Sequence, residues 1–521
     1  MIPHVVDALV LQCLSDALYR EIASKAPTNK SFFKPEDHSF SQFSREKDHS
    51  YGQFQAWLDF QRSIFQFSRT HPYFVVTDVA NYYDTISYTH LRNVISGITA
   101  APEHLLDLLI YVLSSLLWQP HYMPRVEIGL PQINLDAPRL LAHCFLYELD
   151  DFLENSETPD FARYMDDIAV GVDSIQQAKR TLKTIDLVLQ TRQVRLNSGK
   201  TQILTQREAL VHFRVRENAE LDILSISIER RIGAGLSIAA QVRRVERKIR
   251  TGLDRGHFQG GNGEKILKRL ISLARRSGAS IAHDDSHYIL RMWPGTRENV
   301  YDYLASRELT TPSVKMLRDF AYGGMVVDDA SVILLINSIN HTLSTRRVGP
   351  ETYLRLIARS LDEKSFFGLY SKIWLLSKYG STTELLSLLQ RTQTAWSGNY
   401  RLSRLVGGLR PLFVGSAQYD GALRLVARSR NAGAAETWRF HTRLSTDPAV
   451  FRLMWPALKS PNTSKATGIT HAKFTLLLSA LSNRSVPSTQ ITALLNFNKL
   501  VWKDFFYRRW ARETLGIRRF P

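Results

Sequence analysis

Apolar and polar positions follow two different patterns along this chain, with a change near residue 238. Before it, short apolar runs such as Phe74–Val76, and those on either side of the sequence RYMDD, have the length and β-branched content of buried strands. Longer segments with helical spacing separate these runs, at residues 102–118, 139–154 and 174–192. Strands that alternate with helices predict an α+β or α/β unit.

From residue 238 onward the pattern is almost entirely helical. Segments of about 12–18 residues carry apolar positions at helical spacing and are joined by short polar turns. Ser381 and Glu384 have the spacing of a capping box, and Asp447 precedes Pro448 as a cap residue precedes a first-turn proline. We therefore expect stacked helical pairs, although the sequence shows no fixed repeat period.

The length of the chain limits the number of domains expected, and its charge indicates the class of partner. With 521 residues it is too long for one core, so roughly two to four domains are expected. The 67 Lys and Arg residues exceed the 49 Asp and Glu residues, which gives a formal net charge of +18. Such a surplus favours a polyanionic partner, nucleic acid first and an anionic membrane surface second, although a soluble protein can also be basic without one.

The cysteine content and the N-terminal segment indicate where in the cell the protein is expected. The two cysteines, Cys13 and Cys144, cannot build a disulfide framework or a cysteine-rich zinc site, which suits a reducing cytoplasm. The first 25 residues have helical spacing and acidic residues in place of the basic start of a signal peptide. No run of 18 apolar residues occurs, so no membrane span is expected.

Three carboxylates stand at the ends of the predicted strands. Asp78 follows the apolar run at 74–76, and Asp166 and Asp167 lie in the turn between two later strands. If these strands are neighbours, the like charges repel one another unless a cation joins them. Carboxylate oxygens with positions left for water and phosphate suit Mg²⁺. Two such ions about 4 Å apart can activate a hydroxyl and stabilise a leaving pyrophosphate, so the predicted chemistry is nucleotidyl transfer.

Each of these features also has an ordinary explanation when it is taken alone. An Asp-Asp pair is common in solvated hairpin turns, and a single Asp at the end of a strand is more common still. The combination in this order, on a basic chain, favours the catalytic interpretation.

Four segments resemble motifs A to D of reverse transcriptases, in the same order. They are DVANYYD at 78–84, GLPQ at 129–132, RYMDD at 163–167 and LNSGKT at 196–201. The first has an aromatic residue five positions after its Asp, and the third has the Tyr-x-Asp-Asp pattern with the preceding arginine of group II intron and related enzymes. The resemblance spans about residues 70–210 and implies a palm and fingers core.

The resemblance also implies the roles of the carboxylates and their metal. Asp78, Asp166 and Asp167 would be the catalytic and metal-binding carboxylates. Asp78 and Asp166 would hold two Mg²⁺ ions, which Mn²⁺ could replace, and the carbonyl of Val79 would assist. Lys200 would contact the phosphates or protonate the leaving pyrophosphate, although a solvated turn lysine is its simpler explanation.

Two further residues would contact the incoming nucleotide. Tyr83 stands at the position of the sugar-selecting aromatic residue, where a ring would clash with a 2′-hydroxyl and so favour deoxynucleotides. Gln132 would lie near the same nucleotide. Ordinary packing at a strand end is the alternative for Tyr83 and its neighbour Tyr82.

The chain departs from template-copying enzymes in three places. Ile133 follows GLPQ where Gly is usual, Ala137 stands where Ser is expected, and the basic fingers pattern is missing ahead of Asp78. No RNase H or endonuclease segment follows the core. These departures resemble the abortive-infection reverse transcriptases of bacterial phage defence.

That resemblance implies a specific product and assembly. The family carries a helical, HEAT-like C-terminal domain and makes DNA from dNTPs without a template. A tyrosine hydroxyl takes the first nucleotide, so the single-stranded DNA product would be covalently attached to the protein. Members form homo-oligomers, here expected to be a trimer or hexamer, and the location would be the bacterial cytoplasm, with no membrane partner. Tyr19 and Tyr51 are weak candidates for the priming residue.

We therefore expect an α+β reverse-transcriptase palm and fingers core followed by a large all-α, HEAT-like domain. The expected division is an N-terminal helical or reduced fingers region at 1–70, palm and fingers at 71–237 and a basic helical domain at 238–521. Two alternatives remain: a conventional RNA-templated enzyme of the retron or intron type, and a catalytically idle nucleic-acid-binding protein.

Three segments outside the motifs are open to more than one interpretation. The basic helix at 241–250 could follow a phosphate backbone or form a solvated, ion-paired face. The tail at 505–520 interleaves aromatic residues with arginines, as single-strand grooves do, but could equally be a docked terminal helix. The sequence HDDSHY at 283–288 is interpreted as a solvated polar loop.

Overall fold

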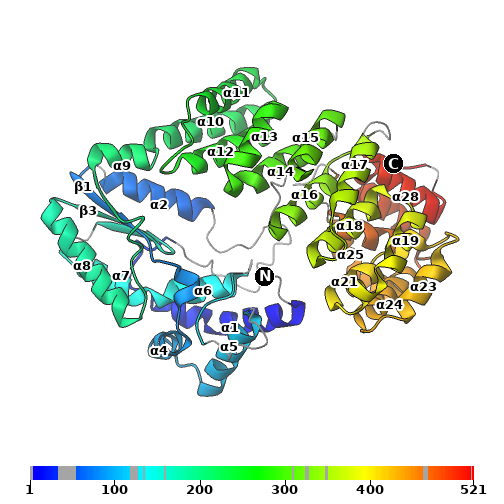
Figure 1. Ribbon diagram of the computed structural model, residues 1–521, viewed down its shortest axis with the longest axis horizontal. Helices are drawn as coiled ribbons and strands as arrows, with labels where there is room; N and C mark the ends of the chain where they lie inside the picture. Colours follow the sequence, from blue (N-terminus) through cyan, green and yellow to red (C-terminus); the bar gives the residue numbers. More distant parts are fainter. Residues whose placement is uncertain are drawn as a thin grey trace. The chain divides into compact units, whose positions relative to one another are not determined.

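The chain forms two compact units, residues 1–219 and 220–521. The computed structural model describes residues 4–32, 54–67, 69–117, 127–132, 135–157, 160–307, 310–322, 328–345, 350–460, 467–517 and 519–521 (Figure 1). The two units are considered separately below. The expected three-part division of the chain stays a prediction.

The first unit contains a four-stranded antiparallel sheet in the order β2-β3-β1-β4. The strands are β1 (Tyr73–Thr77), β2 (Phe161–Tyr164), β3 (Asp167–Val172) and β4 (Gln202–Thr205). The predicted strands at 74–76 and on both sides of RYMDD are thereby confirmed. A single antiparallel bridge between Val79 and Leu196 lies beyond the end of β1.

Nine helices of the described chain surround this sheet, and a tenth crosses into the second unit. They are α1 (Val5–Ser24), α2 (Phe54–Phe67), α3 (Tyr82–Thr85), α4 (Tyr88–Ile98), α5 (Glu103–Leu116), α6 (Asp136–Phe145), α7 (Tyr147–Glu154), α8 (Ile175–Thr191), α9 (Gln206–His212) and α10 (Val215–Gly233). The predicted helices at 102–118, 139–154 and 174–192 are confirmed, with the second broken into α6 and α7.

The two faces of the sheet belong to two different cores. Successive side chains of a strand point to opposite faces. Accordingly Val75 joins the large core formed with α1 and α4–α8, whereas Phe74 joins a small core with Phe60 and Phe67 of α2. Because both faces are covered, β1 is buried along most of its length, which explains its continuous apolar sequence.

His71 holds the start of β1 against the far end of β3. Its ring nitrogens lie 2.8 Å from an oxygen of Asp160 and 2.8 Å from one of Asp173. The ring covers Gly171, where a Cβ would come within 2.5 Å of it. Burial lowers the pKa of His71, but the two carboxylates outweigh burial and raise it above its ordinary value.

The second unit is entirely helical over its described residues. Its helices are α11 (Ala239–Asp254), α12 (Gly263–Ser277), α13 (His283–Met292), α14 (Arg297–Ala305), α15 (Thr311–Tyr322), α16 (Asp329–His341), α17 (Pro350–Ser360), α18 (Phe366–Tyr379), α19 (Thr382–Arg391), α20 (Gln393–Ser397), α21 (Tyr400–Gly407), α22 (Arg410–Phe413), α23 (Tyr419–Ala427), α24 (Gly433–Thr446), α25 (Pro448–Lys459), α26 (His471–Leu481), α27 (Ser488–Phe497) and α28 (Phe505–Leu515). Short 3₁₀ turns lie at Pro294–Thr296 and Val501–Lys503.

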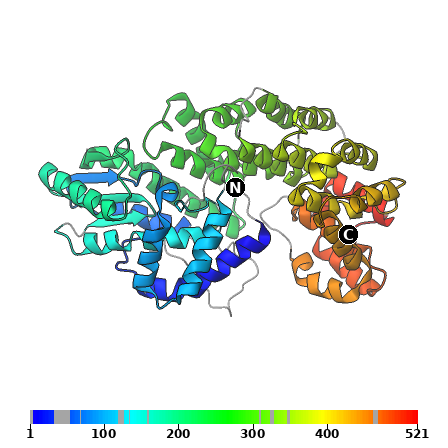
Figure 2. The ribbon, with the colours of Figure 1, turned by 60° about the horizontal axis from the view of Figure 1, so that its bottom comes forward.

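These helices pack in rows of alternate members. The helices α12, α14, α16 and α18 contact one another in sequence, and α13, α15 and α17 form a second row (Figure 2). The predicted caps are present: Ser381 and Glu384 form a capping box, and Asp447 caps α25. Stacked helical pairs therefore exist, while their description as HEAT-like stays a prediction. Within the described ranges, no helix combines the length and hydropathy needed to cross a membrane.

The structure corrects the interpretation of residues 283–288 and decides between the two alternatives for the tail at 505–520. The prediction of a loop at 283–288 is wrong, because these residues open α13, whose Ile289 and Leu290 are buried. Asp284 and Asp285 stand in its first turn, where negative charge is favoured by the helix dipole. The tail forms α28, docked by its buried aromatic face, with Trp510 fully buried.

The raised pKa of His71 predicts a pH-dependent contribution to stability. A raised pKa in the folded state stabilises the fold fully below the ordinary pKa of 6.5, and this contribution is lost as the pH rises through the folded value. The loss in free energy of unfolding caused by His71→Gln should therefore be larger at about pH 5.5 than at about pH 8.5. Urea unfolding at both pH values measures it. An equal loss at both would show that His71 acts by packing alone.

Candidate active site

Asp78 stands directly after β1 with its carboxylate almost completely buried. One oxygen, Oδ2, accepts a 2.6 Å ion-paired hydrogen bond from Nζ of Lys200. The other oxygen, Oδ1, is buried and has no hydrogen-bond partner among the described residues. A buried carboxylate oxygen without a donor costs free energy, so this atom is suited to a cation that the protein itself does not supply.

Lys200 reaches Asp78 because the 196–201 loop folds back on the end of β1. The backbone N–H of Asn197 donates to the Asp78 carbonyl at 2.9 Å. The N–H groups of Lys200 and Thr201 then donate to the Asn197 carbonyl at 3.1 and 3.0 Å, which closes a turn. The hydroxyls of Thr77 and Thr201 lie 2.7 Å apart and join the two segments again. The hydrogen bond to Asp78 is the main cause of a raised pKa of Lys200. Its ammonium therefore stays charged at neutral pH.

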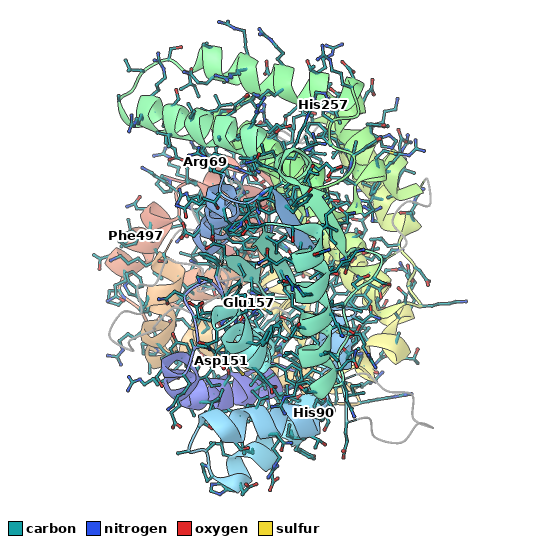
Figure 3. All side chains as sticks on the ribbon, turned by 90° about the vertical axis from the view of Figure 1, so that its left-hand side faces the viewer. Arg69, His90, Asp151, Glu157, His257 and Phe497 are labelled. Carbon is teal, nitrogen blue, oxygen red and sulfur yellow. The ribbon has the colours of Figure 1, made fainter. Side chains whose placement is uncertain are left out.

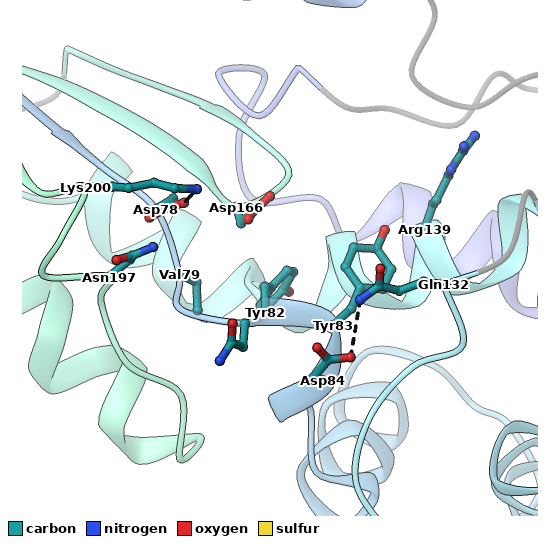
Figure 4. Close-up of a pocket in the computed structure, with 11 residues that line it drawn as sticks. Asp78, Val79, Tyr82, Tyr83, Asp84, Gln132, Arg139, Asp166, Asn197 and Lys200 are labelled. Atoms are coloured by element: carbon teal, nitrogen blue, oxygen red, sulfur yellow. Dashed lines mark hydrogen bonds and ion pairs between the residues drawn. The ribbon is translucent and has the colours of Figure 1, made fainter. Parts of the chain in front are cut away.

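Asp166 is delivered to the same place by a two-residue hairpin turn. Tyr164 of β2 pairs with Asp167 of β3, so Met165 and Asp166 alone form the turn. Met165 takes a positive φ of 57°, the left-handed backbone that tight hairpins require but that a residue with a side chain seldom adopts. Because β1 pairs with β3, Asp166 comes to lie beside Asp78 and faces the same pocket (Figure 4).

The negative charges of this cluster oppose one another. Burial of Asp166, the adjacent charge of Asp167 and the charge of Asp78 together raise the pKa of Asp166 to about 6. Asp167, at the start of β3, is exposed, and it does not line the pocket. The cluster therefore carries more negative charge than Lys200 neutralises.

A buried ion pair stabilises the hairpin turn between β2 and β3. Arg163 is fully buried, and its Nε donates to Oδ1 of Asp150 at 2.6 Å while Nη2 contacts Oδ2. Its Nη1 donates to the carbonyl of Met165 at 2.7 Å, which fixes the backbone of the turn that carries Asp166. The arginine of RYMDD thus positions the turn and takes no part in the pocket. Sequence reasoning did not assign a role to Asp150, because helix α7 carries four acids and its sequence alone does not distinguish the buried one.

The pocket has a volume of about 580 Å³. Its lining consists of Asp78, Val79, Asn81, Tyr82, Tyr83, Asp84, Gln132, Arg139, Asp166, Asn197 and Lys200. Figure 4 shows Asp78, Asp166 and Lys200 on one side of Tyr83, and Gln132 and Arg139 on the other, with Asp84 beside Gln132. Burial raises the pKa of Tyr83 to about 12, so its phenol is neutral. Tyr82 is buried, and its hydroxyl donates to the carbonyl of Ala142.

The 129–132 loop is tied to helix α3, which carries Tyr83. The N–H of Leu130 donates to the Tyr83 carbonyl at 2.7 Å, and that of Gly129 donates to the Ile86 carbonyl at 2.8 Å. Gly129 has a φ of 100°, which only glycine adopts readily. The Gln132 side chain donates to Oδ1 of Asp84 at 3.2 Å, so its amide is oriented at the pocket wall.

Six of the seven predicted site residues therefore share one pocket, and Asp167 lies outside it. Sequence reasoning did not assign a role to Asn81, Asp84, Arg139 or Asn197 in its wall. Asp84 had a signal, as the second acid of the DVANYYD segment.

Within the described residues, no three His, Cys, Asp or Glu side chains are arranged as a ready-made metal site. The donor set nevertheless fits Mg²⁺, which proteins commonly hold with one or two carboxylates while water and substrate phosphates complete the shell. Asp78 offers a buried oxygen that has no donor among the described residues, and the raised pKa of Asp166, about 6, reflects negative neighbours that a cation would offset. These two residues would hold the ion.

Comparison with known proteins identifies the kind of domain. Residues 16–228 match the family model described as reverse transcriptase (RNA-dependent DNA polymerase), a range that includes the whole sheet and every predicted site residue. No curated protein sequence matches this chain. Among solved structures, a telomerase from Candida albicans in complex with the TWJ fragment of telomeric RNA matches with 11% identity and a TM-score of 0.27. That match covers 70% of this chain and 56% of the telomerase chain, so this chain spans little more than half of the telomerase's length.

Loss of the buried ion pair should be costly. Asp150→Asn leaves the Arg163 guanidinium buried without its counter-ion, which should lower the free energy of unfolding by about 3–5 kcal/mol. Asp107→Asn is the matched control, because it breaks an exposed pair with Arg92 and should have little effect. Urea unfolding measures both. Equal effects of the two substitutions would contradict the role given to Arg163 and Asp150.

Asp166→Asn should stabilise the metal-free protein at neutral pH. With a folded pKa of about 6 against an ordinary 3.8, the stabilising contribution of protonated Asp166 is complete below the ordinary value and is lost as the pH rises through about 6. The substitution should therefore raise the free energy of unfolding by about 1–2 kcal/mol at pH 7.5, allowing for partial exposure, and change it little at about pH 4.

Mg²⁺ provides the second half of that test. It should stabilise the unsubstituted protein and leave Asp166→Asn nearly unaffected, because binding to the folded state alone raises stability. Thermal unfolding with and without Mg²⁺ measures the difference. An equal gain in both proteins would show that the ion binds elsewhere.

Proposed function

We propose that this chain is a DNA polymerase of the reverse-transcriptase family that joins dNTPs by metal-dependent nucleotidyl transfer. In the finer proposal, synthesis needs no template, starts on a tyrosine of the protein and serves abortive-infection defence against phage. One observation carries the chemistry: β1 and the β2–β3 turn place Asp78 and Asp166 in one pocket, where a buried oxygen of Asp78 has no donor within the described part of the chain.

The pocket residues have distinct tasks in this reaction. Asp78 and Asp166 would hold the divalent ions, which when bound would supply activation of the attacking hydroxyl and stabilisation of the charge on the phosphates. Lys200 places a charged ammonium beside Asp78, where it can contact the triphosphate. Tyr83 forms the wall between the carboxylates and Gln132, where its ring limits the space for a 2′-hydroxyl. The Val79 carbonyl, the exposed Asp167 and a proton donated by Lys200 are secondary parts of the proposal.

The second unit offers a surface for a polyanionic product. On α11, Arg244 and Lys248 face Glu220, at 4.0 and 2.5 Å. Arg243, Arg247 and Arg250 are exposed on another side of this helix, and none has a carboxylate partner among the described residues. Figure 3 shows long side chains projecting from this helix near His257. Unpaired arginines at helical spacing are suited to contacts with phosphates.

Template independence and protein priming are supported by the departures in sequence. Ala137, which replaces the expected serine, is fully buried at the start of α6. Ile133 lies outside the described residues, as does the candidate primer Tyr51. Tyr19, the other candidate, is packed partly buried against the core on α1. The homo-oligomer, expected to be a trimer or hexamer, and the bacterial cytoplasm belong to the same proposal.

A templated enzyme is the second candidate, because the matching family model is described as an RNA-dependent DNA polymerase. The same site serves both reactions. They differ in whether a nucleic-acid strand selects the incoming nucleotide and in whether a tyrosine of the protein is the primer.

The deciding experiment uses purified protein, labelled dNTPs and Mg²⁺, with no added nucleic acid. We expect label that stays on the protein through denaturing electrophoresis and maps to one tyrosine, because the primer would be a side-chain hydroxyl. Asp166→Asn should reduce labelling by at least 10³-fold, in line with loss of an essential electrostatic group. Asp107→Asn, an exposed acid in the same unit, is the matched control and should label normally.

Each other outcome has a definite meaning. DNA that forms only after addition of an RNA or DNA template would establish the templated alternative. Absence of synthesis under both conditions, with Asp166→Asn unchanged in its biological activity, would contradict polymerisation and favour a nucleic-acid-binding role.

A further inference from the structure

The segment between Asp447 and Asp504 has an unusual charge composition. These 56 residues contain seven Lys and Arg residues and no Asp or Glu. The chain as a whole carries 49 acidic residues among 521, so a stretch of this length would ordinarily include several. The segment covers α25, α26 and α27 and confers a local positive charge that no acid of its own offsets.

Two of these helices bring aromatic side chains together at the surface. Phe497 at the end of α27 is 41% exposed, and Trp455 of α25 is half-buried. The rings of Trp455 and Phe497 meet edge to face, with centroids 6.3 Å apart. Nζ of Lys459 lies 4.7 Å from the centroid of the Phe497 ring. Figure 3 shows Phe497 projecting at the outer edge of its unit.

Hydrogen bonds from one side chain to two backbone carbonyls fix this arrangement. The side chain of Asn498 donates to the carbonyl of Leu458 on α25 and to that of Leu494 on α27, both at 3.0 Å. This side chain ties the ends of the two helices together and keeps Phe497 beside Lys459. Trp455 is supported by Phe451, which is buried, with ring centroids 5.5 Å apart. The rings are therefore held in place before any ligand binds, which reduces the entropic cost of binding.

We propose that this surface binds single-stranded DNA. The aromatic platform consists of Trp455, Lys459 and Phe497, and the neighbouring sequence adds the exposed cations Arg452 and Lys499. Bases stack on the faces of Phe497 and Trp455, and the three cations contact the phosphates, the combination by which proteins hold single strands without reading their sequence. The choice of DNA rests on the proposed function, which makes such a strand; the platform itself does not depend on that function.

The composition of the surface favours this partner over another protein. An exposed apolar patch by itself is equally suited to a protein interface. Protein interfaces, however, deplete lysine, whereas here Lys459 lies over the Phe497 ring and no acid occurs in the segment. Cations interleaved with aromatic rings match the charge and the exposed bases of a single strand.

Binding of a labelled oligothymidine of about 20 nucleotides, measured by fluorescence anisotropy at low salt, tests the proposal. The measurement omits dNTPs and Mg²⁺, so its result is independent of polymerase activity. Phe497→Ala should weaken binding about tenfold, because each stacked base contributes substantially to affinity. Lys459→Gln should weaken it and lower the slope of log affinity against log salt by about one.

The matched control is Phe440→Ala. Phe440 on α24 has a similar exposure of 37%, and no cation lies over its ring among the described residues. Its substitution should change DNA affinity by less than about twofold. Because Phe440 and Phe497 are both partly exposed, each variant is expected to fold, which equal thermal midpoints would verify. An oligonucleotide containing 5-iododeoxyuridine should, on irradiation, become attached within residues 451–460 or at Phe497.

The contrary results are distinct. Equal affinities for Phe497→Ala and Phe440→Ala, with no attachment in these segments, would overturn the proposal. Unchanged DNA binding together with a smaller assembly in Phe497→Ala would make the platform an interface between copies of this chain. Tighter binding of oligouridine than of oligothymidine would replace DNA by RNA. Normal DNA binding by a protein that makes no DNA would sink the proposed function and leave this inference standing.

Discussion

The candidate site depends on the buried ion pair between Arg163 and Asp150. Two full charges are withdrawn from water there, at a cost that only good geometry repays. In exchange, the pair fixes the position of the hairpin turn. Arg163 also donates to the Met165 carbonyl, and Met165 is a non-glycine residue held at positive φ. Without that donor the turn could relax, and Asp166 would swing away from Asp78. The protein thus accepts the free-energy cost of burying this ion pair, and the pair holds the carboxylate of Asp166 in place.

The arrangement that follows is electrostatically incomplete. Asp78 and Asp166 face each other, Asp167 adds charge beside them, and the ammonium of Lys200 meets one oxygen of Asp78. The raised pKa of Asp166 records this imbalance. Functional sites commonly retain such unfavourable charge because a ligand later relieves it. A divalent ion with its bound triphosphate would supply the positive charge at the carboxylates and carry the negative charge toward Lys200.

The strands and the carboxylates could be predicted from sequence because both leave local signals. A short β-branched run at 74–76 and a tight turn at Met165–Asp166 need no knowledge of distant residues. The order of four motifs then indicated which strand ends meet. The contact between Arg163 and Asp150 could not be predicted in this way, since it joins a strand to a helix that precedes it and depends on a shared core. For the same reason Arg139 was not assigned to the pocket wall.

The error at 283–288 has a different origin. His, Asp and Ser residues suggested a solvated loop, but at the start of a helix they satisfy the first turn, and burial of Ile289 and Leu290 stabilises the rest. Local polarity was outweighed by tertiary packing.

The central claim is that Asp78 and Asp166 hold a catalytic divalent ion. It is tested most directly by anomalous diffraction from crystals soaked with Mn²⁺ and a non-hydrolysable dNTP analogue. The account predicts a manganese peak within coordination distance, about 2.2 Å, of oxygens from both residues and of the triphosphate. Binding of the analogue without manganese at these carboxylates, with Lys200 still joined to Asp78 as their only cation, would contradict it.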